Sequence, residues 1–255
     1  MNILFTICAR AGSKGVKGKN TKIFCGKPLV NYTLAAYELF CEKYGDRAEH
    51  IFLALNTDSE LLFEQVNENK IEYIPIKRDD SLAGDFVGKM DVIRDTLVKC
   101  EEQKDMQFDV IIDLDLTSPL RTVADVEGTL NVLLANPQAD ISYSVTHARR
   151  LPDFNMVRKN ENGFYEQVIK SNYVSRQQAP DYYDMNASIY AYRRAYLLNG
   201  PSSEEVKELI WKMKDTGVLD IDSEEDFELM QIIAEYFFDK KDGYREIYKF
   251  LNHHL

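Results

Sequence analysis

Short apolar runs of strand length alternate along this chain with segments that carry the period of an α-helix. The apolar runs lie at residues 2–9, 50–56, 71–77, 108–116 and 140–147, and apolar residues with helical spacing occur at 29–40, 92–100 and 126–134. Near-continuous apolar strands separated by helices are typical of a largely parallel sheet that is covered on both faces. We therefore expect a three-layer α/β domain, in which ligands bind at the carboxyl ends of the strands.

The alternation stops at residues 149–184, where short strand-like pieces surround an Asn-Gly turn and no strong helix is indicated. It resumes with an expected strand at 188–192, a helix at 203–214, a strand at 218–221 and a helix that Ser223 opens. Ser223 and Asp226 have the spacing of a capping box. We predict one α/β domain formed by residues 1–148 and 185–255, with an inserted arm at 149–184.

A basic, glycine-rich loop follows the first apolar run of an otherwise acidic chain. The formal net charge is -11, yet residues 10–27 hold six Lys or Arg side chains and no acid. This local reversal of sign indicates a compact anionic ligand, whereas nucleic-acid binding usually needs a broader basic face. The four cysteines have no CxxC spacing, and no apolar run approaches the roughly 20 residues of a membrane span. These features predict a cytoplasmic protein with reduced thiols and disfavour nucleic acid and membranes as partners.

The loop does not match the two better-known phosphate-binding sequences. A P-loop, G-x-x-x-x-G-K-[ST], fails because Ser13 stands five residues before Gly18 and Asn20 follows Lys19. The dinucleotide pattern G-x-G-x-x-G fails because the glycines at 12, 15 and 18 are evenly spaced. The backbone N–H groups and lysines of such a loop can still surround a triphosphate. Taken alone, the loop is equally consistent with a solvated basic turn.

Three further stretches follow this loop: LDLTSPLR at 114–121, SRQQAPDYYDMNASIYAY at 175–192 and LDIDSEEDFE at 219–228. Together with A-R-x-G-S-K-G and the following K-N, they resemble the acylneuraminate cytidylyltransferases, the CMP-sugar synthetases that activate nonulosonic acids. The resemblance covers nearly the whole chain. It implies a Rossmann-like nucleotidyltransferase domain with a mostly parallel sheet and an inserted dimerisation arm. It also implies a homodimer that uses Mg²⁺ and converts CTP and a nonulosonic acid to CMP-sugar and pyrophosphate.

The resemblance assigns the nucleotide to the loop and to the end of the third strand. Phosphoryl-type transfer depends on neutralising charge, which suits a guanidinium and two ammonium groups. The implied phosphate ligands are Arg10, Lys14 and Lys19, joined by Ser13 and Asn20 as ligands of the nucleotide. Arg78 and residues 82–85, which include Asp85, resemble the cytosine-binding segment. A charged loop without a ligand is the alternative for Arg78.

Metal and sugar are assigned to the later motifs. Asp220 and Asp222 alternate across Ile221, so on a strand both carboxylates would face one side and suit Mg²⁺. Asp222 is accordingly expected to be both a metal ligand and a catalytic residue. The resemblance implies that Arg176, supplied by the arm, binds the sugar carboxylate. The other implied sugar ligands are Asp115, Ser118, Gln177, Asn186 and Tyr190.

Asp115 marks a departure from the sialic acid pattern. Those enzymes usually read L-Q-P-T-S-P-L-R, with glutamine where this chain has Asp115. An ionised carboxylate only accepts hydrogen bonds, whereas an amide also donates them. LDLTSPLR and YDMNASIY look more like the branch that handles legionaminic acid, so this substrate is favoured over N-acetylneuraminic acid. The alternatives are a CMP-Kdo synthetase and a catalytically silent nucleotide-sugar-binding protein. Whether Asp115 serves the sugar or the metal is left open.

Overall fold

The structure is a computed structural model that describes residues 1–12, 15–84, 86–201, 203–214 and 220–255. The predicted nucleotide ligands Ser13, Lys14 and Asp85 lie outside the described residues, as do residues 218 and 219 of the strand expected at 218–221.

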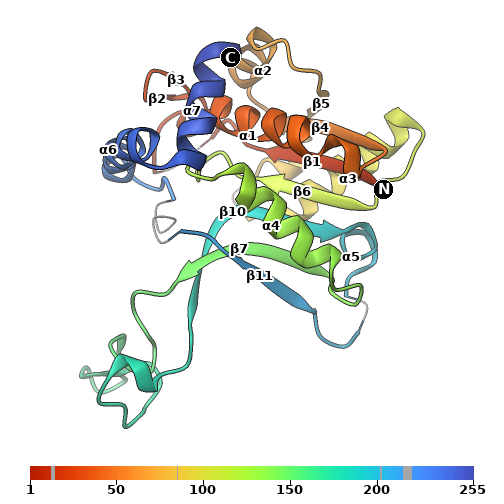
Figure 1. Ribbon diagram of the computed structural model, residues 1–255. Helices are drawn as coiled ribbons and strands as arrows, with labels where there is room; N and C mark the ends of the chain where they lie inside the picture. Colours follow the sequence, from red (N-terminus) through yellow and green to blue (C-terminus); the bar gives the residue numbers. More distant parts are fainter. Residues whose placement is uncertain (13–14, 85, 202, 215–219) are drawn as a thin grey trace.

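A seven-stranded sheet forms the centre of the described chain, in the order β11-β7-β10-β6-β1-β4-β5 (Figure 1). Neighbouring strands are parallel except where β10 pairs with β6 and β7, to which it runs antiparallel. The five apolar runs predicted as strands are therefore confirmed as strands of one mostly parallel sheet. The strands are β1 (Asn2–Cys8), β4 (His50–Thr57), β5 (Ile74–Lys77), β6 (Val110–Leu114), β7 (Ile141–His147), β10 (Tyr183–Arg193) and β11 (Glu208–Lys212).

Helices cover both faces of this sheet and enclose two apolar cores. In β1, Ile3 and Phe5 face one core while Leu4 faces the other, because alternate side chains of a strand point to opposite faces. The three-layer architecture is confirmed. The first core packs against α1 (Leu29–Tyr44), α2 (Glu60–Glu68), α4 (Val123–Leu134), α6 (Glu224–Lys240) and α7 (Asp242–His254), and the second against α3 (Lys89–Lys104) and α5 (Arg194–Asn199). None of the described helices is both long enough and apolar enough to cross a bilayer.

The arm leaves the sheet at the ends of β7 and β10, where His147 pairs with Tyr183. Its hairpin consists of β8 (Val157–Lys159) and β9 (Tyr165–Gln167). The Asn-Gly turn predicted there is closed by Asn160, whose Oδ1 accepts the backbone N–H of Phe164 at 3.0 Å. Figure 1 shows this segment, coloured green to teal, reaching away from the three layers.

The helix expected at residues 203–214 is wrong. Glu208–Lys212 form β11, which adds parallel to β7 at the edge of the sheet. Trp211 anchors this strand, because its Nε1 donates to Asp125 Oδ1 at 3.1 Å and its ring lies where a side chain on Gly128 of α4 would clash. The pattern of polar and apolar residues in this segment does not distinguish a helix from a strand. Pairing with the edge of β7 makes residues 208–212 a strand.

The region before α6 differs from the expected strand as well. The described residues 220–222 form no strand, so the alternation expected to place both aspartates on one face does not apply. Ile221 is buried, as expected. The capping box is confirmed, since Ser223 Oγ accepts the N–H of Asp226 and Asp226 accepts the N–H of Ser223.

Candidate active site

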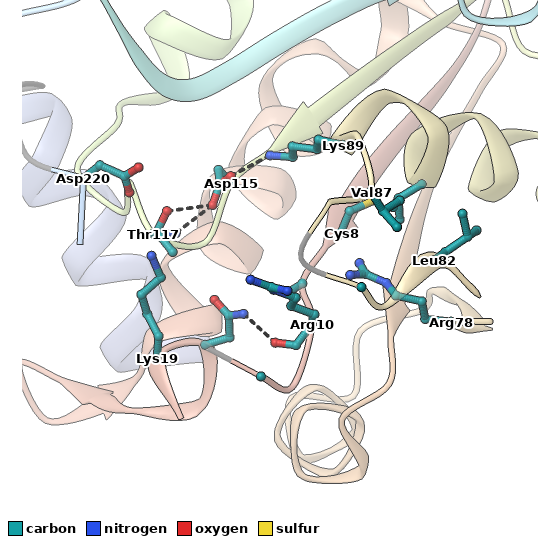
Figure 2. A pocket seen from close by; sticks show the side chains of 15 residues that line it. Cys8, Arg10, Lys19, Arg78, Leu82, Val87, Lys89, Asp115, Thr117 and Asp220 are labelled. Atoms are coloured by element: carbon teal, nitrogen blue, oxygen red, sulfur yellow. Dashed lines mark hydrogen bonds and ion pairs between the residues drawn. The ribbon is translucent and has the colours of Figure 1, made fainter. Parts of the chain in front are cut away.

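A cavity of about 340 Å³ opens at the carboxyl ends of the parallel strands β1, β4, β5 and β6 (Figure 2). Arg78, Leu82 and Val87 line one end, and Asp115, Thr117 and Asp220 line the other. Arg10 stands between the two ends, and Lys19, also on the basic loop, lies on the side of Thr117 and Asp220 (Figure 2). The position agrees with the general rule for open α/β sheets, in which ligands bind outside the strand ends. The other described lining residues are Cys8, Ala9, Gly12, Asn20, Gly84, Lys89 and Val92.

The basic loop is held against the strand ends by its own backbone. Ala11 N–H donates to Asp58 Oδ1 at 2.6 Å, and the Asn20 amide donates to the carbonyl of Arg10 at 2.9 Å. Asn20 Oδ1 is buried and has no hydrogen-bond partner among the described residues. Gly15 packs so closely on the carbonyl of Asp222 that a Cβ there would clash with it. The glycine is therefore needed for close approach of this loop to the segment before α6.

Lys19 joins the loop to the same segment. Its Nζ donates to the carbonyl of Ile221 and lies 3.2 Å from Asp222 Oδ1. The Asp222 side chain is 77% exposed, whereas that of Lys19 is 15% exposed. Lys19 can therefore contribute positive charge to the cavity while it fixes the approach of the chain to α6.

The end of the cavity near Arg78 is lined mainly by apolar side chains apart from this guanidinium. Arg78 follows β5 and is buried against the end of β4, where Asn56 accepts two of its hydrogen bonds. Burial lowers the pKa of Arg78, although a guanidinium still remains charged at neutral pH. Leu82 and Val87 supply apolar walls, and Cys8 adds a thiol whose pKa burial raises to about 12. This end suits an uncharged aromatic ring that offers hydrogen-bond acceptors.

The opposite end is organised by one lysine and two aspartates. Lys89, at the start of α3, places its Nζ 2.6 Å from Asp115 Oδ2 and 2.7 Å from Asp113 Oδ2. Asp113 is fully buried, and its Oδ1 also accepts the hydroxyl of Thr6 at 2.8 Å. Asp115 Oδ1 accepts the N–H and the hydroxyl of Thr117 at 3.0 and 2.9 Å. Both oxygens of Asp115 are thereby fixed in direction.

The charge of this cluster follows from the same contacts. Burial by itself raises the pKa of Asp115, but the charge and hydrogen bond of Lys89, with the bonds from Thr117, lower it to about 2. Burial works against the charge of Lys89 too, yet Asp113 and Asp115 raise the pKa of its ammonium well above the usual range. The lysine and Asp115 are therefore both charged at neutral pH.

Asp220 lines the cavity beside Thr117 (Figure 2), whereas Asp222 is not among its described lining residues. Burial and the carboxylates of Asp115 and Asp222 raise the pKa of Asp220. Its Oδ1 is buried without a hydrogen-bond partner among the described residues. A buried carboxylate oxygen that faces other carboxylates has the chemistry of a hard-cation ligand. Of the predicted pair, Asp220 is therefore the member that the structure places on the cavity wall, although the described residues contain no cluster of three or more potential metal ligands.

Three predicted sugar ligands lie behind the cavity rather than on its described lining. Ser118 is buried and its hydroxyl donates to the carbonyl of Asn186 at 2.9 Å. Asn186 is buried too, and its Oδ1 accepts the hydroxyl of Ser144 at 2.7 Å in the bulge of β10. The ring of Tyr190 lies 5.7 Å from Lys89 Nζ. Ser118 and Asn186 thus hold the turn after β6, and Tyr190 packs near the lysine that pairs with Asp113 and Asp115.

Arg176 and Gln177 lie in a different cavity, of about 250 Å³, at the root of the arm. His147, Leu151 and Tyr182 line this cavity with them. The Arg176 guanidinium donates to the carbonyl of Ala148. Within one chain, the arm residues predicted to bind sugar are thus separated from the cavity at the strand ends.

Sequence reasoning missed several residues that build the site. Lys89 reads as one more charge on an amphipathic helix, and nothing in its local spacing pairs it with 113 and 115. The D-x-D at those two positions was a usable signal, because residues two apart on a strand share a face. Arg121 ends the LDLTSPLR motif, which by itself gives this residue no role. It is fully buried, and its guanidinium donates to the carbonyls of Asp115 and Ser118, which fixes the turn that presents Asp115.

Comparison with known proteins adds a family to this geometry. A family model described as "Cytidylyltransferase" matches residues 4–241. The "post-translational flagellin modification protein B" of Campylobacter coli is 36% identical and is matched over 91% of this chain and 95% of its own length. The "CMP-N,N'-diacetyllegionaminic acid synthase" of Campylobacter jejuni subsp. jejuni is also 36% identical, over 91% of this chain and 94% of its own.

More distant similarities extend in two directions. The "N-acylneuraminate cytidylyltransferase" of Streptococcus agalactiae is 26% identical over 94% of this chain and 54% of its own length. Among solved structures, a CMP:2-keto-3-deoxy-manno-octonic acid synthetase complexed with CTP has a TM-score of 0.63 at 16% identity. That match covers 92% of this chain and 99% of the other, and at this identity it concerns the fold alone.

Proposed function

This chain belongs to the cytidylyltransferase family and is a nucleotidyltransferase, and we propose that it converts CTP and a nonulosonic acid to CMP-sugar and pyrophosphate, with legionaminic acid as the favoured sugar. The observation that carries the proposal is the 36% identity, over nearly the full length of both chains, with a CMP-N,N'-diacetyllegionaminic acid synthase. The cavity at the strand ends supports it, since its basic loop suits phosphates and its apolar end suits a base.

In the proposed reaction the anomeric hydroxyl of the sugar attacks the α-phosphorus of CTP, and pyrophosphate leaves. Charge accumulates on the phosphate oxygens, so preorganised cations contribute most of the catalysis. Arg10 and Lys19 would neutralise this charge from the loop, with Lys14 as a further proposed ligand. The cytosine would lie between Leu82 and Val87 beside Arg78, which offers N–H donors to the acceptors of the base.

We also propose that the reaction uses Mg²⁺. Asp220 and Asp115 would hold it, and when bound it would stabilise negative charge on the phosphate oxygens as a Lewis acid. The unpartnered Oδ1 of Asp220 supports this assignment. Asp222 remains an alternative ligand. Lys89 keeps Asp115 ionised and pointed in one direction, which any of these arrangements requires.

Asp115 bears on the choice of sugar. Lys89 and Thr117 already donate to both oxygens of Asp115, which leaves room for about one further contact, whether from an N–H group of the sugar or to a metal ion. The preference for legionaminic acid then rests on the named relatives more than on this single residue. The CMP-Kdo alternative has weaker support, since the matching structure shares only 16% identity.

We propose that the enzyme is a homodimer in which the arm of one protomer completes the sugar site of the other. Apolar side chains on the arm face solvent in a single chain, with Phe164 72% and Tyr165 71% exposed. An exposed apolar surface of this kind is typical of a protein interface. The separation of Arg176 from the cavity within one chain supports a contribution to the partner's cavity. The cytoplasmic location predicted from the sequence stays a proposal.

Measurement of pyrophosphate release with CTP, Mg²⁺ and four sugar acids tests this function. The panel consists of N,N'-diacetyllegionaminic, N-acetylneuraminic, pseudaminic and 2-keto-3-deoxy-manno-octonic acid. We expect the highest kcat/KM for the legionaminic compound. A preference for the octonic acid would overturn the substrate class, and absence of release with every sugar would favour the catalytically silent alternative.

A further inference from the structure

The guanidinium of Arg78, at the apolar end of the cavity, donates to Asn56 twice. Its Nε donates to Asn56 Oδ1 at 2.8 Å, and its Nη2 donates to the Asn56 carbonyl at 3.0 Å. Asn56 thus accepts from the guanidinium through both its side chain and its backbone. Two such bonds fix the plane of a guanidinium, which is rigid and carries five donors in a fixed geometry.

Asn56 is itself fixed in one orientation. It lies on β4, is fully buried, and pairs in register with Cys8 of β1 and Ile76 of β5. Its Nδ2 donates to Thr96 Oγ1 at 2.9 Å, and the Thr96 hydroxyl donates to the carbonyl of Val92 at 2.7 Å. Because the threonine hydroxyl proton is used by Val92, Thr96 can only accept from Asn56. The amide oxygen must therefore face Arg78.

The chain of bonds leaves a defined set of donors for a ligand. Among the described residues, the bonds to Asn56 use the inner edge of the guanidinium and leave Nη1 and the second N–H of Nη2. Arg78 lines the cavity together with Leu82 and Val87. The orientation of its outer edge is consequently set by Asn56 and Thr96, neither of which is among the described residues that line the cavity.

We infer that Asn56 is a positioning residue that fixes Arg78 so that the cavity selects cytosine over uracil. The inference rests on the proposed use of CTP. Cytosine presents acceptors at N3 and O2, whereas uracil carries a proton on N3. A guanidinium only donates, so an Arg78 that is fixed toward N3 and O2 of the base can bond to cytosine but meets an N–H group at N3 of uracil. An Arg78 that is free to turn would lose this discrimination.

The test compares Kd and kcat/KM for CTP and UTP in the parent and in Asn56→Leu, which has similar size and no polar atoms. A site built around one hydrogen bond rejects an analogue that lacks it by large factors, so the CTP-to-UTP ratio should fall about tenfold or more in the variant. The loss should appear in Kd and KM for CTP, with kcat at saturating CTP largely retained. Asn56→Asp keeps an acceptor oxygen for Arg78 Nε and should restore most of the ratio.

Two further variants separate positioning from general stability. Asn31→Leu removes another buried amide, which joins α1 to Asn69 at the end of α2, and should leave the ratio unchanged. If Asn56→Leu does not fold, Thr96→Val removes the acceptor that orients Asn56 with little change in volume, and the ratio should still fall severalfold.

A ratio that stays at the parent value in folded Asn56→Leu, or in Thr96→Val where Asn56→Leu does not fold, would overturn the inference, as would equal losses for both nucleotides. Failure of the proposed function would look different. In that case the parent itself would neither bind CTP nor distinguish it from UTP.

Discussion

The ammonium of Lys89 lies 2.6 Å from Oδ2 of Asp115, on the wall of the cavity where the strands end. The same nitrogen lies 2.7 Å from Asp113, which is fully buried. One lysine from the first turn of α3 therefore compensates two carboxylates from the end of β6. The same lysine therefore stabilises the buried Asp113 and keeps Asp115 ionised on the cavity wall.

Replacement of Lys89 by methionine should destabilise the fold, because it leaves the buried Asp113 without its cationic partner. Removal of one member of a buried pair costs about 3 kcal/mol or more in the free energy of unfolding. Lys99→Met is the matched control on the same helix, since Lys99 is as exposed as Lys89 but pairs at 2.7 Å with Asp95, which is 25% exposed where Asp113 is fully buried, in an i,i+4 contact worth about 0.5 kcal/mol or less. Urea denaturation of both variants measures the difference. Equal effects would mean that the cluster is not a buried ion pair.

Stability should depend on Asp115 in a defined pH range. Its pKa is lowered from 3.8 to about 2 in the folded protein, so its ionised form contributes stability above about pH 4. This contribution is lost as the pH falls toward 2, because the unfolded chain takes up the proton first. The free-energy difference between the parent and Asp115→Asn should therefore shrink from pH 4 downward. A constant difference between pH 7 and 3 would contradict the assignment.

Arg10→Ala should lose activity without losing the fold. Deletion of one preorganised donor to developing charge costs about 2.7–4 kcal/mol in transition-state stabilisation, which corresponds to a loss of about 100- to 1,000-fold in kcat. Lys17→Ala, an exposed residue of the same loop, is the matched control and should retain near-parent turnover. Thermal unfolding should be similar in both. Near-parent kcat in Arg10→Ala would remove the loop from the phosphate site.

The two acidic positions before α6 should respond differently to loss of charge. Asp220→Asn removes a partly buried carboxylate that lines the cavity, whereas Asp222→Asn changes an exposed one that pairs with Lys19. A neutral amide is a poorer ligand for a hard divalent cation. The Mg²⁺ concentration at half-maximal activity should rise much more in Asp220→Asn, and direct Mn²⁺ binding should weaken in parallel. The reverse order would restore Asp222 as the main ligand.

The arm can be tested by mixing two inactive variants. Arg176→Ala has an intact cavity and a defective arm, and Arg10→Ala has the opposite combination. If the arm acts on the partner, random re-association of equal amounts makes about half of the dimers mixed, and each mixed dimer has one intact site of two. About a quarter of all sites are then intact. Mixing should then restore about that share of parent activity. No gain on mixing, with re-association verified by mass measurement, would show that the arm does not act across the dimer.

The sequence predicts much of this fold because the apolar periods are strong where the core is. β1, β4 and β6 are nearly continuous apolar runs, β7 alternates apolar with polar residues, and the alternation of strands with helices leaves few other topologies. The sequence predicts a helix at β11 because what makes this segment a strand is its pairing with β7 and the packing of Trp211 against α4. Both contacts join segments that are far apart in the chain. Periodicity within a segment carries no information about such partners.

The site was predictable to a similar extent. Arg10, Lys19, Asn20, Arg78, Asp115 and Asp220 were predicted as site residues, and all six line one cavity. Lys89 and Asn56 could not be found, since a lysine at the start of a helix and an asparagine in a strand have no chemical signature until the fold sets them against Asp115 and Arg78. The predicted pair of Asp220 and Asp222 is not reproduced as a pair on the cavity wall, since Asp220 lines the cavity and Asp222 is not among its described lining residues.

The central claim is that this enzyme joins CMP to a nonulosonic acid. Phosphorus NMR and mass spectrometry of the products from CTP, Mg²⁺ and N,N'-diacetyllegionaminic acid test it most directly. We predict one CMP-sugar phosphodiester and one pyrophosphate for each CTP consumed, with no product when CTP is replaced by UTP. Release of free CMP with unchanged sugar, or no consumption of CTP in a folded and dimeric preparation, would contradict the account.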